Sequence, residues 1–181
     1  LRHAFFQVVS VISTTGFTTT DWEQWPHFCQ GILFVLFFVG GCSGSTSGGM
    51  KCVRWLLLFK GIHRTLRQHI HPRAVISVRL GGGAVPETMM TAVWSFGAIY
   101  FIVLTISTLL LAAMDLNILT ALSASASAIG NVGLGLGDVG PSSNFAGLPA
   151  GAKVVLSLGM FLGRLEFFAL MILFLPDFWK K

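Results

Sequence analysis

Long runs without charged residues limit what this chain can fold into. Residues 89–114 carry no Asp, Glu, Lys or Arg, and residues 151–175 form a second long apolar segment. Each is longer than the roughly 20 residues that cross a bilayer as a helix. Only 10% of the 181 residues are charged, whereas soluble domains have about 25%. The sequence therefore predicts an all-α membrane protein rather than a soluble domain with a wetted surface.

Three further apolar segments are too short or too interrupted to be simple spans. Residues 31–41 lead into the sequence GGCSGSTSGGM at residues 40–50, after which apolar residues resume. We interpret this region as one span broken near the middle of the membrane. Residues 5–12 and 118–129 are each followed by a loop that contains glycine. Their lengths suit re-entrant half-helices, with interfacial or core helices as the alternative.

Charged residues are divided unevenly between the loops. Residues 51–87 contain one acid, Glu87, and the basic residues Lys51, Arg54, Lys60, Arg64, Arg67, Arg73 and Arg79. The loops at residues 14–30 and 131–150 contain acids but no Lys or Arg. Because positive residues stay on the cytoplasmic side of a membrane, we expect residues 51–87 and the C-terminus inside the cell and both acidic loops outside. Topology explains the basic residues better than a nucleic-acid partner does, and membrane lipid is the expected surrounding.

A constant offset relates the two halves of the chain. An offset of 117 residues places Ser10, Ile12, Thr14, Gly16 and Asp21 on Ser127, Ile129, Asn131, Gly133 and Asp138, and an offset of 123 residues places Gly40 on Gly163. The repeating unit is a span, a re-entrant half-helix, a loop and a second span. The chain then divides into residues 1–70, the end of one repeat; residues 71–87, a cytoplasmic linker that could form a β-hairpin; and residues 88–181, one complete repeat.

The loops that follow the two half-helices are the candidate ion site. Backbone that is not helical occurs at membrane depth only where it is buried in protein or lines a watery path. Its carbonyl oxygens can replace the water shell of an alkali cation, and glycine permits backbone conformations that a Cβ atom would obstruct. The candidate filter residues are Thr14, Thr15, Gly16 and Phe17 in one strip and Asn131, Val132, Gly133 and Leu134 in the other. We expect Asp21 and Asp138 at the outer mouth, where they would attract cations.

The glycine-rich break is the candidate gate. Arg164 and Glu166 lie at mid-membrane in the sequence, where a charge costs about 2.5 to 3.5 kcal/mol on insertion scales. We expect Arg164, which aligns with Gly41, to face the pore below the filter as an electrostatic barrier, and Glu166 to pair with a neighbouring helix. A buried ion pair of Arg164 with Glu166 or with an upstream acid is the alternative. The candidate gate residues are Gly40, Gly41, Gly44, Ser45, Gly48, Gly49 and Arg164.

Five motifs together resemble the Trk/Ktr/HKT superfamily of potassium transporters: STTGF, GGCSGSTSGG, HPRAVISVRL, GNVGLG and GRLEFF. Their order is most similar to the C-terminal half of the bacterial TrkH/TrkG membrane subunits. The resemblance implies a pore of four span–pore-helix–span repeats, of which this sequence would hold the end of repeat three and all of repeat four. In that family, filter carbonyls come from the residues aligned with Thr14, Thr15, Asn131 and Val132. The loop aligned with residues 40–49 is the intramembrane gate.

The same resemblance implies a location and partners. It implies potassium uptake across the bacterial inner membrane, with loops 14–30 and 131–150 periplasmic. It also implies a homodimer and a cytosolic ring of nucleotide-binding, TrkA-like regulatory subunits, which we expect on the basic inner face between Arg64 and Arg79. Because two of the four filter strips are absent, we expect a fragment of a longer protein, with assembly of two copies as the alternative. Selectivity for potassium over sodium stays open, as does symport with protons or sodium against passive flux.

Two other classes of protein compete with an ion pathway. A secondary transporter of a small organic solute could also use broken helices, but these loops lack side chains suited to such a ligand. In a membrane hydrolase, a serine or cysteine of residues 40–49 would have to act as the nucleophile, yet the segment does not match the G-x-S-x-G elbow. A phosphate loop needs adjacent Gly and Lys, and Met50 separates Gly49 from Lys51. We therefore predict that the chain is not an enzyme and that its one ligand is the transported potassium ion.

Overall fold

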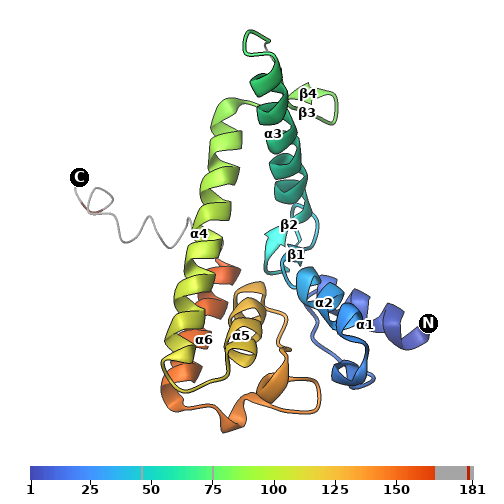
Figure 1. Ribbon diagram of the computed structural model, residues 1–181, viewed down its shortest axis with the longest axis vertical. Coiled ribbons are helices and arrows are strands. Elements are labelled where there is room, and N and C mark those ends of the chain that lie inside the picture. The colour runs from blue at the N-terminus through green and yellow to red at the C-terminus, as the bar shows by residue number, and fades with distance from the viewer. Residues whose placement is uncertain (46, 75, 166–178, 180–181) are drawn as a thin grey trace.

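The computed structural model describes residues 1–45, 47–74, 76–165 and 179. The described chain is mostly helical (Figure 1). Its α-helices are α1 (Arg2–Ile12), α2 (His27–Leu36), α3 (Cys52–Ile70), α4 (Glu87–Ala112), α5 (Ile118–Gly130) and α6 (Ala150–Arg164). Short 3-10 helices lie in the loops: η1 (Trp22–Gln24), η2 (Gly137–Val139) and η3 (Phe145–Gly147). The strands are two residues each: β1 (Val39–Gly40), β2 (Met50–Lys51), β3 (Arg79–Leu80) and β4 (Gly83–Ala84).

Helix α4 extends along most of the molecule, and the lower part of it packs against α5 and α6 (Figure 1). In the described part of the chain, α4 is the one helix that is long and apolar enough to cross a membrane. The expected span at residues 151–175 is described only as far as Leu165. Glu166 and the C-terminal lysines, Lys180 and Lys181, lie outside the described residues.

Helix α5 is the most deeply buried element. Its central sequence alternates Ala and Ser, and every residue from Ser123 to Gly130 is buried. Small side chains allow neighbouring helices to approach closely. On α6, a Cβ atom added to Gly163 would lie 2.0 Å from the carbonyl oxygen of Ile129. The C-terminal end of α5, where the second candidate filter strip begins, is therefore held directly against the α6 backbone.

Aromatic residues attach the first half of the chain to α4. Trp22, Phe37 and Tyr100 are fully buried. The rings of Trp22 and Phe37 meet edge-on with centroids 6.4 Å apart, and the Phe38 ring lies 6.2 Å from that of Tyr100. Edge-on aromatic pairs add about 0.5 to 1.5 kcal/mol beyond the area that they bury. Trp22 and Phe37 share one hydrophobic core with Tyr100 of α4 and with Ala126 and Ile129 of α5, which joins the first half of the chain to both helices.

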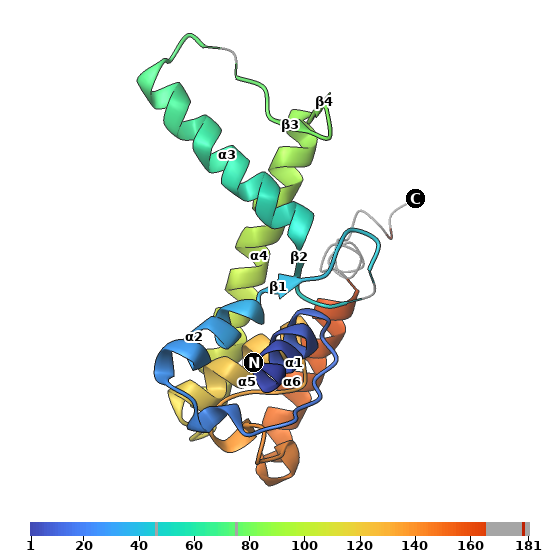
Figure 2. The ribbon, with the colours of Figure 1, turned by 90° about the vertical axis from the view of Figure 1, so that its right-hand side faces the viewer.

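A two-strand ladder replaces the helix between α2 and α3. Val39 pairs with Met50 and Gly40 with Lys51, in parallel. The chain thus leaves β1, makes the loop of residues 41–49, and returns beside its own starting point. Helix α3 then diverges from α4 (Figure 2). The glycine-rich segment therefore separates α2 from α3, as the sequence indicates. The sequence does not indicate that the two ends of this segment lie side by side.

The linker between α3 and α4 contains an antiparallel hairpin in which Arg79 lies opposite Ala84. Gly81 and Gly82 form the turn with φ of +57° and +89°, as two-residue hairpin turns require. Val78, next to the hairpin, is buried against Leu57 of α3 and residues of α4. The linker is therefore anchored to both helices.

Candidate ion filter and gate loop

The first candidate strip begins where α1 ends. Its amide groups turn back onto the helix: Thr14 N donates to Val11 O (3.0 Å) and Thr15 N to Ser10 O (2.9 Å). Thr14 has φ of +53° and Gly16 of +74°. A β-branched residue with positive φ is an outlier, and such strain costs of the order of 1–3 kcal/mol and gathers at functional sites. The backbone here is held in a conformation that local preferences oppose.

The second candidate strip has the same backbone. Asn131 N donates to Ala128 O (3.1 Å) and Val132 N to Ser127 O (2.9 Å). Asn131 has φ of +54° and Gly133 of +89°. Every one of these atoms and angles corresponds to its counterpart in the first strip at the offset of 117 residues. Because successive carbonyls of a regular strand alternate in direction, the repeated departure into left-handed backbone changes which way these carbonyls point.

The two strips lie against each other although they are far apart in the sequence. A Cβ atom added to Gly16 would lie 2.2 Å from the carbonyl oxygen of Val132. Hydrogen bonds between described residues leave the carbonyl oxygens of both strips free: none ends on those of Thr14, Thr15, Gly16, Asn131, Val132, Gly133 or Leu134. The fourth residue of the first strip differs, because Phe17 O accepts a hydrogen bond from Ser10 Oγ (2.7 Å).

Serine side chains of α1 and α5 form hydrogen bonds to the backbone of both strips. Ser10 is buried and bonds to Phe17 O, and the buried Ser127 accepts from Gly133 N at 3.0 Å. Ser123 contacts Leu136 twice, accepting from its N (2.9 Å) and donating to its O (3.2 Å). Gln7 is buried as well and donates to Thr20 O at 3.2 Å. Ser10 and Ser127 are equivalent at the offset of 117 residues, but their position as polar residues on short apolar helices was the only sequence signal for this role.

Asp21 and Asp138, the acids expected at the outer mouth, accept hydrogen bonds within the loops. Asp21 caps η1 by accepting from Glu23 N at 3.0 Å, and it also accepts from Ser142 Oγ at 3.3 Å. Asp138 accepts from Thr120 Oγ1 at 3.2 Å. Glu23, which the sequence analysis left without a role, joins the two loops because its Oε1 accepts from Gly137 N at 2.5 Å. The side chains of Asp21 and Glu23 therefore join the two loops that follow the strips.

The candidate gate loop touches the base of the second strip. A Cβ atom added to Gly48 would lie 2.4 Å from Gly130 O and 2.8 Å from the Cβ of Asn131. The amide of Asn131 also donates to Met160 O on α6 at 3.2 Å. Asn131 is thus the residue at which the second strip, the loop of residues 40–49 and α6 meet.

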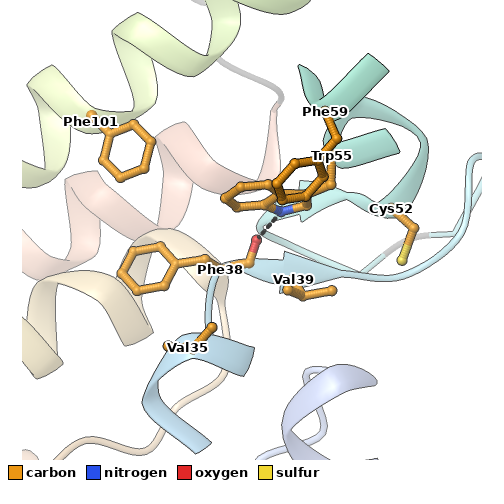
Figure 3. Close-up of a pocket in the computed structure, with 7 residues that line it drawn as sticks. All are labelled: Val35, Phe38, Val39, Cys52, Trp55, Phe59 and Phe101. Atoms are coloured by element: carbon orange, nitrogen blue, oxygen red, sulfur yellow. Dashed lines mark hydrogen bonds between the residues drawn. The ribbon is translucent and has the colours of Figure 1, made fainter. Parts of the chain in front are cut away.

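Inside the loop, most of the hydrogen bonds between described residues involve serine hydroxyl groups. Gly41 N donates to Ser47 Oγ (2.8 Å), and Ser45 N donates to Cys42 O (3.0 Å). Gly44 and Gly49 have φ of +87° and +74°. A further hydrogen bond fixes the base of the loop, where Trp55 Nε1 on α3 donates to Phe38 O at 3.0 Å (Figure 3).

An apolar cavity of about 410 Å³ lies beside this base of the loop. It is lined by Val35, Phe38, Val39, Cys52, Trp55, Phe59 and Phe101 (Figure 3). The Trp55 and Phe59 rings stack with centroids 6.0 Å apart. The cavity contains none of the expected gate residues, so it carries no part of the candidate ion path.

Arg164 is the last residue of α6 and is exposed. Its neighbour Gly163 packs on Ile129 O and lies near the amide of Asn131. Among the described residues, no hydrogen bond or ion pair involves the Arg164 side chain, and the alternative pairing with Glu166 falls outside the described residues. The structure therefore places the Arg164 backbone close to the point where gate loop and second strip meet.

Paired short helices whose loops present unbonded backbone carbonyls are typical of helical proteins that select ions. The whole chain, residues 1–181, matches the family model described as TrkH, cation transport protein, and the chain belongs to this family. This membership confirms the resemblance drawn from the five motifs and the prediction that the chain is not an enzyme.

Individual relatives of the chain are members of the same family. The chain is 44% identical to the Trk system potassium uptake protein TrkH of Salmonella typhimurium, over all of this chain and 37% of the relative. It is 39% identical to TrkG of Escherichia coli, over 99% of this chain and 36% of the relative. The crystal structure of the potassium transporter TrkH from Vibrio parahaemolyticus superposes with a TM-score of 0.90 at 44% identity, over 98% of this chain and 38% of that structure. The chain thus spans little more than a third of the length of these relatives.

Proposed function

We propose that this chain supplies two of the filter strips and the gate loop of a transporter that takes up potassium across the bacterial inner membrane. One observation carries the proposal: two strips, 117 residues apart in the sequence, have left-handed backbone at equivalent positions, and apart from that of Phe17 their carbonyl oxygens accept no hydrogen bond from described residues. Relatives named as potassium uptake proteins match over the whole chain.

The chemistry follows from those oxygens. Thr14, Thr15 and Gly16 on one side, and Asn131, Val132 and Gly133 on the other, would replace part of the hydration shell of a bare potassium ion. The C-terminal ends of α1 and α5 add partial negative charge at the same place. Two strips surround an ion on two sides only. The remaining length of the relatives, or a second copy of this chain, would supply the others.

The loop of residues 40–49 is the proposed gate. It lies against Asn131 at the base of the strip, where a path from the filter toward the cytoplasm would have to pass. Its ends are fixed by β1 and β2, whereas residues 42–45 in its middle are exposed. Arg164 would add a positive charge at this level and so raise the energy of a cation that passes.

Replacing Arg164 by alanine tests this barrier. We expect Arg164→Ala in the whole transporter to raise potassium flux without the regulatory subunit by at least about tenfold, because unit charges about 4 Å apart interact by about 4 kcal/mol at an effective dielectric constant of 20. Arg164→Lys should keep the low flux. Lys153→Ala removes the other cation of α6, which bonds to Ala146 O, and should leave flux unchanged. Flux of rubidium into vesicles that is the same for Arg164→Ala and the parent would refute the barrier.

The proposed orientation places loops 14–30 and 131–150 in the periplasm and residues 51–87 in the cytoplasm. The basic residues of the described chain gather on α3 and the linker, and positive residues favour the inner side. We propose that the transporter is a homodimer in membrane lipid, and that a TrkA-like nucleotide-binding subunit docks on the inner face around Arg64 to Arg79.

A further inference from the structure

A basic pocket lies near the far end of α3 from the gate loop. Its volume is about 280 Å³, and it is lined by Lys60, His63, Arg64, Arg67, Ile76, Ser77, Val78 and Arg79. None of these lining residues is acidic. The pocket is formed between one face of α3 and the chain segment that leads into the β3–β4 hairpin.

The cations converge on this pocket from two separate elements. Lys60, Arg64 and Arg67 recur at the spacing of residues that share one face of a helix. Arg79 comes from β3 on the other side, and its carbonyl oxygen accepts from Lys60 Nζ at 2.7 Å. That hydrogen bond fixes the ammonium group of Lys60 at the wall of the pocket without neutralising its charge.

Arg64 shows that the pocket is incomplete as it stands. Its Nη1 is paired with Glu87 Oε1 at 2.5 Å, and Glu87 lines a separate pocket to which none of the other cations belongs. Its Nε is buried and has no hydrogen-bond partner among the described residues. A buried donor left unpaired costs about 1–3 kcal/mol, so an acceptor that reached this nitrogen would be favoured. The side chains of Lys60, Arg67 and Arg79, together with the unpaired Nε of Arg64, favour an anion with several oxygens.

We infer that the pocket binds the phosphate of an anionic phospholipid headgroup, an inference that rests on the cytoplasmic orientation proposed above. Basic pockets beside membrane helices on the inner side suit such headgroups. Two apolar residues, Ile76 and Val78, line the pocket beside the cations. Phe59, Ile62 and Leu66 of the same helix are exposed, and their spacing places them on one face, which would provide a surface for acyl chains. A soluble phosphate would gain nothing from these apolar neighbours.

Orientation alone does not require such convergence. The positive-inside tendency needs Lys and Arg only on the correct side of the membrane, and Arg73 satisfies it while lining a different hollow, with Ile70, His71, Pro72 and Ala74. Arg73 is therefore a matched control: it has the same charge on the same linker but lies outside the basic pocket.

The test measures binding of a short-chain phosphatidylglycerol to the whole transporter in detergent. Each of Arg67→Gln and Arg79→Gln should weaken binding about fivefold and the double variant about thirtyfold, from about 1 kcal/mol per cation near an anionic headgroup. Arg67→Lys should bind nearly as the parent does, and Arg73→Gln should leave binding unchanged. Phosphatidylcholine and inorganic phosphate should each bind far more weakly than phosphatidylglycerol.

Several results would overturn the inference. Equal weakening by Arg73→Gln would show a diffuse attraction to the whole linker. Equally tight binding of inorganic phosphate would assign the pocket to a soluble anion. Variants that keep lipid binding but lose the regulatory subunit would assign it to that partner. Rubidium uptake measured in parallel keeps the proposals apart, since failure of lipid binding with normal uptake refutes only the lipid site.

Discussion

Replacing Gly16 by alanine is expected to lower potassium uptake by the whole transporter about a hundredfold. The added Cβ would lie 2.2 Å from Val132 O, and Gly16 has φ of +74°, which L-residues other than glycine rarely adopt. Contacts under 3.0 Å essentially never occur for real Cβ atoms, so the second strip would have to move by about 0.8 Å. A misplacement of about 1 Å in a preorganised site can cost about a hundredfold.

Two matched glycines separate the causes of that loss. Gly133 also has positive φ, but no atom of a described residue lies within 4 Å of an added Cβ; Gly133→Ala should reduce uptake by about tenfold, from backbone strain of about 1–2 kcal/mol alone. Gly31 of α2 has neither positive φ nor a close neighbour in the described part of the chain, and Gly31→Ala should leave uptake unchanged. Initial rates of rubidium uptake into proteoliposomes give the comparison. A Gly16→Ala transporter as active as Gly31→Ala would contradict the contact between the strips.

Replacing Gly48 by alanine is expected to increase flux in the absence of the regulatory subunit by at least about tenfold. Its Cβ would collide with Gly130 O and the Cβ of Asn131. Something must move, and the burial of Gly130 among α5 residues favours the loop over the strip. Overpacking contacts of this kind cost about 1–3 kcal/mol. A loop pushed away from the strip would no longer obstruct the path below it.

Gly44 provides the control for this variant. It has φ of +87° but no atom of a described residue within 4 Å of an added Cβ, so Gly44→Ala strains the same loop without pushing it from the strip. Its flux should remain within about twofold of the parent. If Gly48→Ala instead lowers flux and weakens discrimination between potassium and sodium, the strip has moved and the loop is not the gate.

The helices could be predicted well from the sequence because their apolar segments are long or clearly ended. The uncharged run at residues 89–114 corresponds to α4, Glu87–Ala112, and the half-helix at 118–129 corresponds to α5, Ile118–Gly130. Helix α1 begins earlier than expected, at Arg2, because polar residues at a helix end cost little when they reach solvent. The offset of 117 residues identified the equivalent loops before their backbone angles were known.

Contacts between distant segments could not be predicted in the same way. The pairing of β1 with β2 involves two residues a side, too few for any periodic pattern. Glu23 lies among polar loop residues, and nothing in its neighbourhood indicates the bond to Gly137 N. The expected role of Asp21 and Asp138 considered only their charge, whereas both accept hydrogen bonds that shape the loops. The filter and gate assignments themselves remain predictions.

The most direct test of the account is the position of a heavy monovalent ion in the whole transporter. Crystals grown with thallium or rubidium in place of potassium should show anomalous density between the strip that contains Gly16 and the strip that contains Gly133. The ion should lie within coordination distance of carbonyl oxygens from both. Ion density elsewhere in the protein, with none between these strips, would contradict the account.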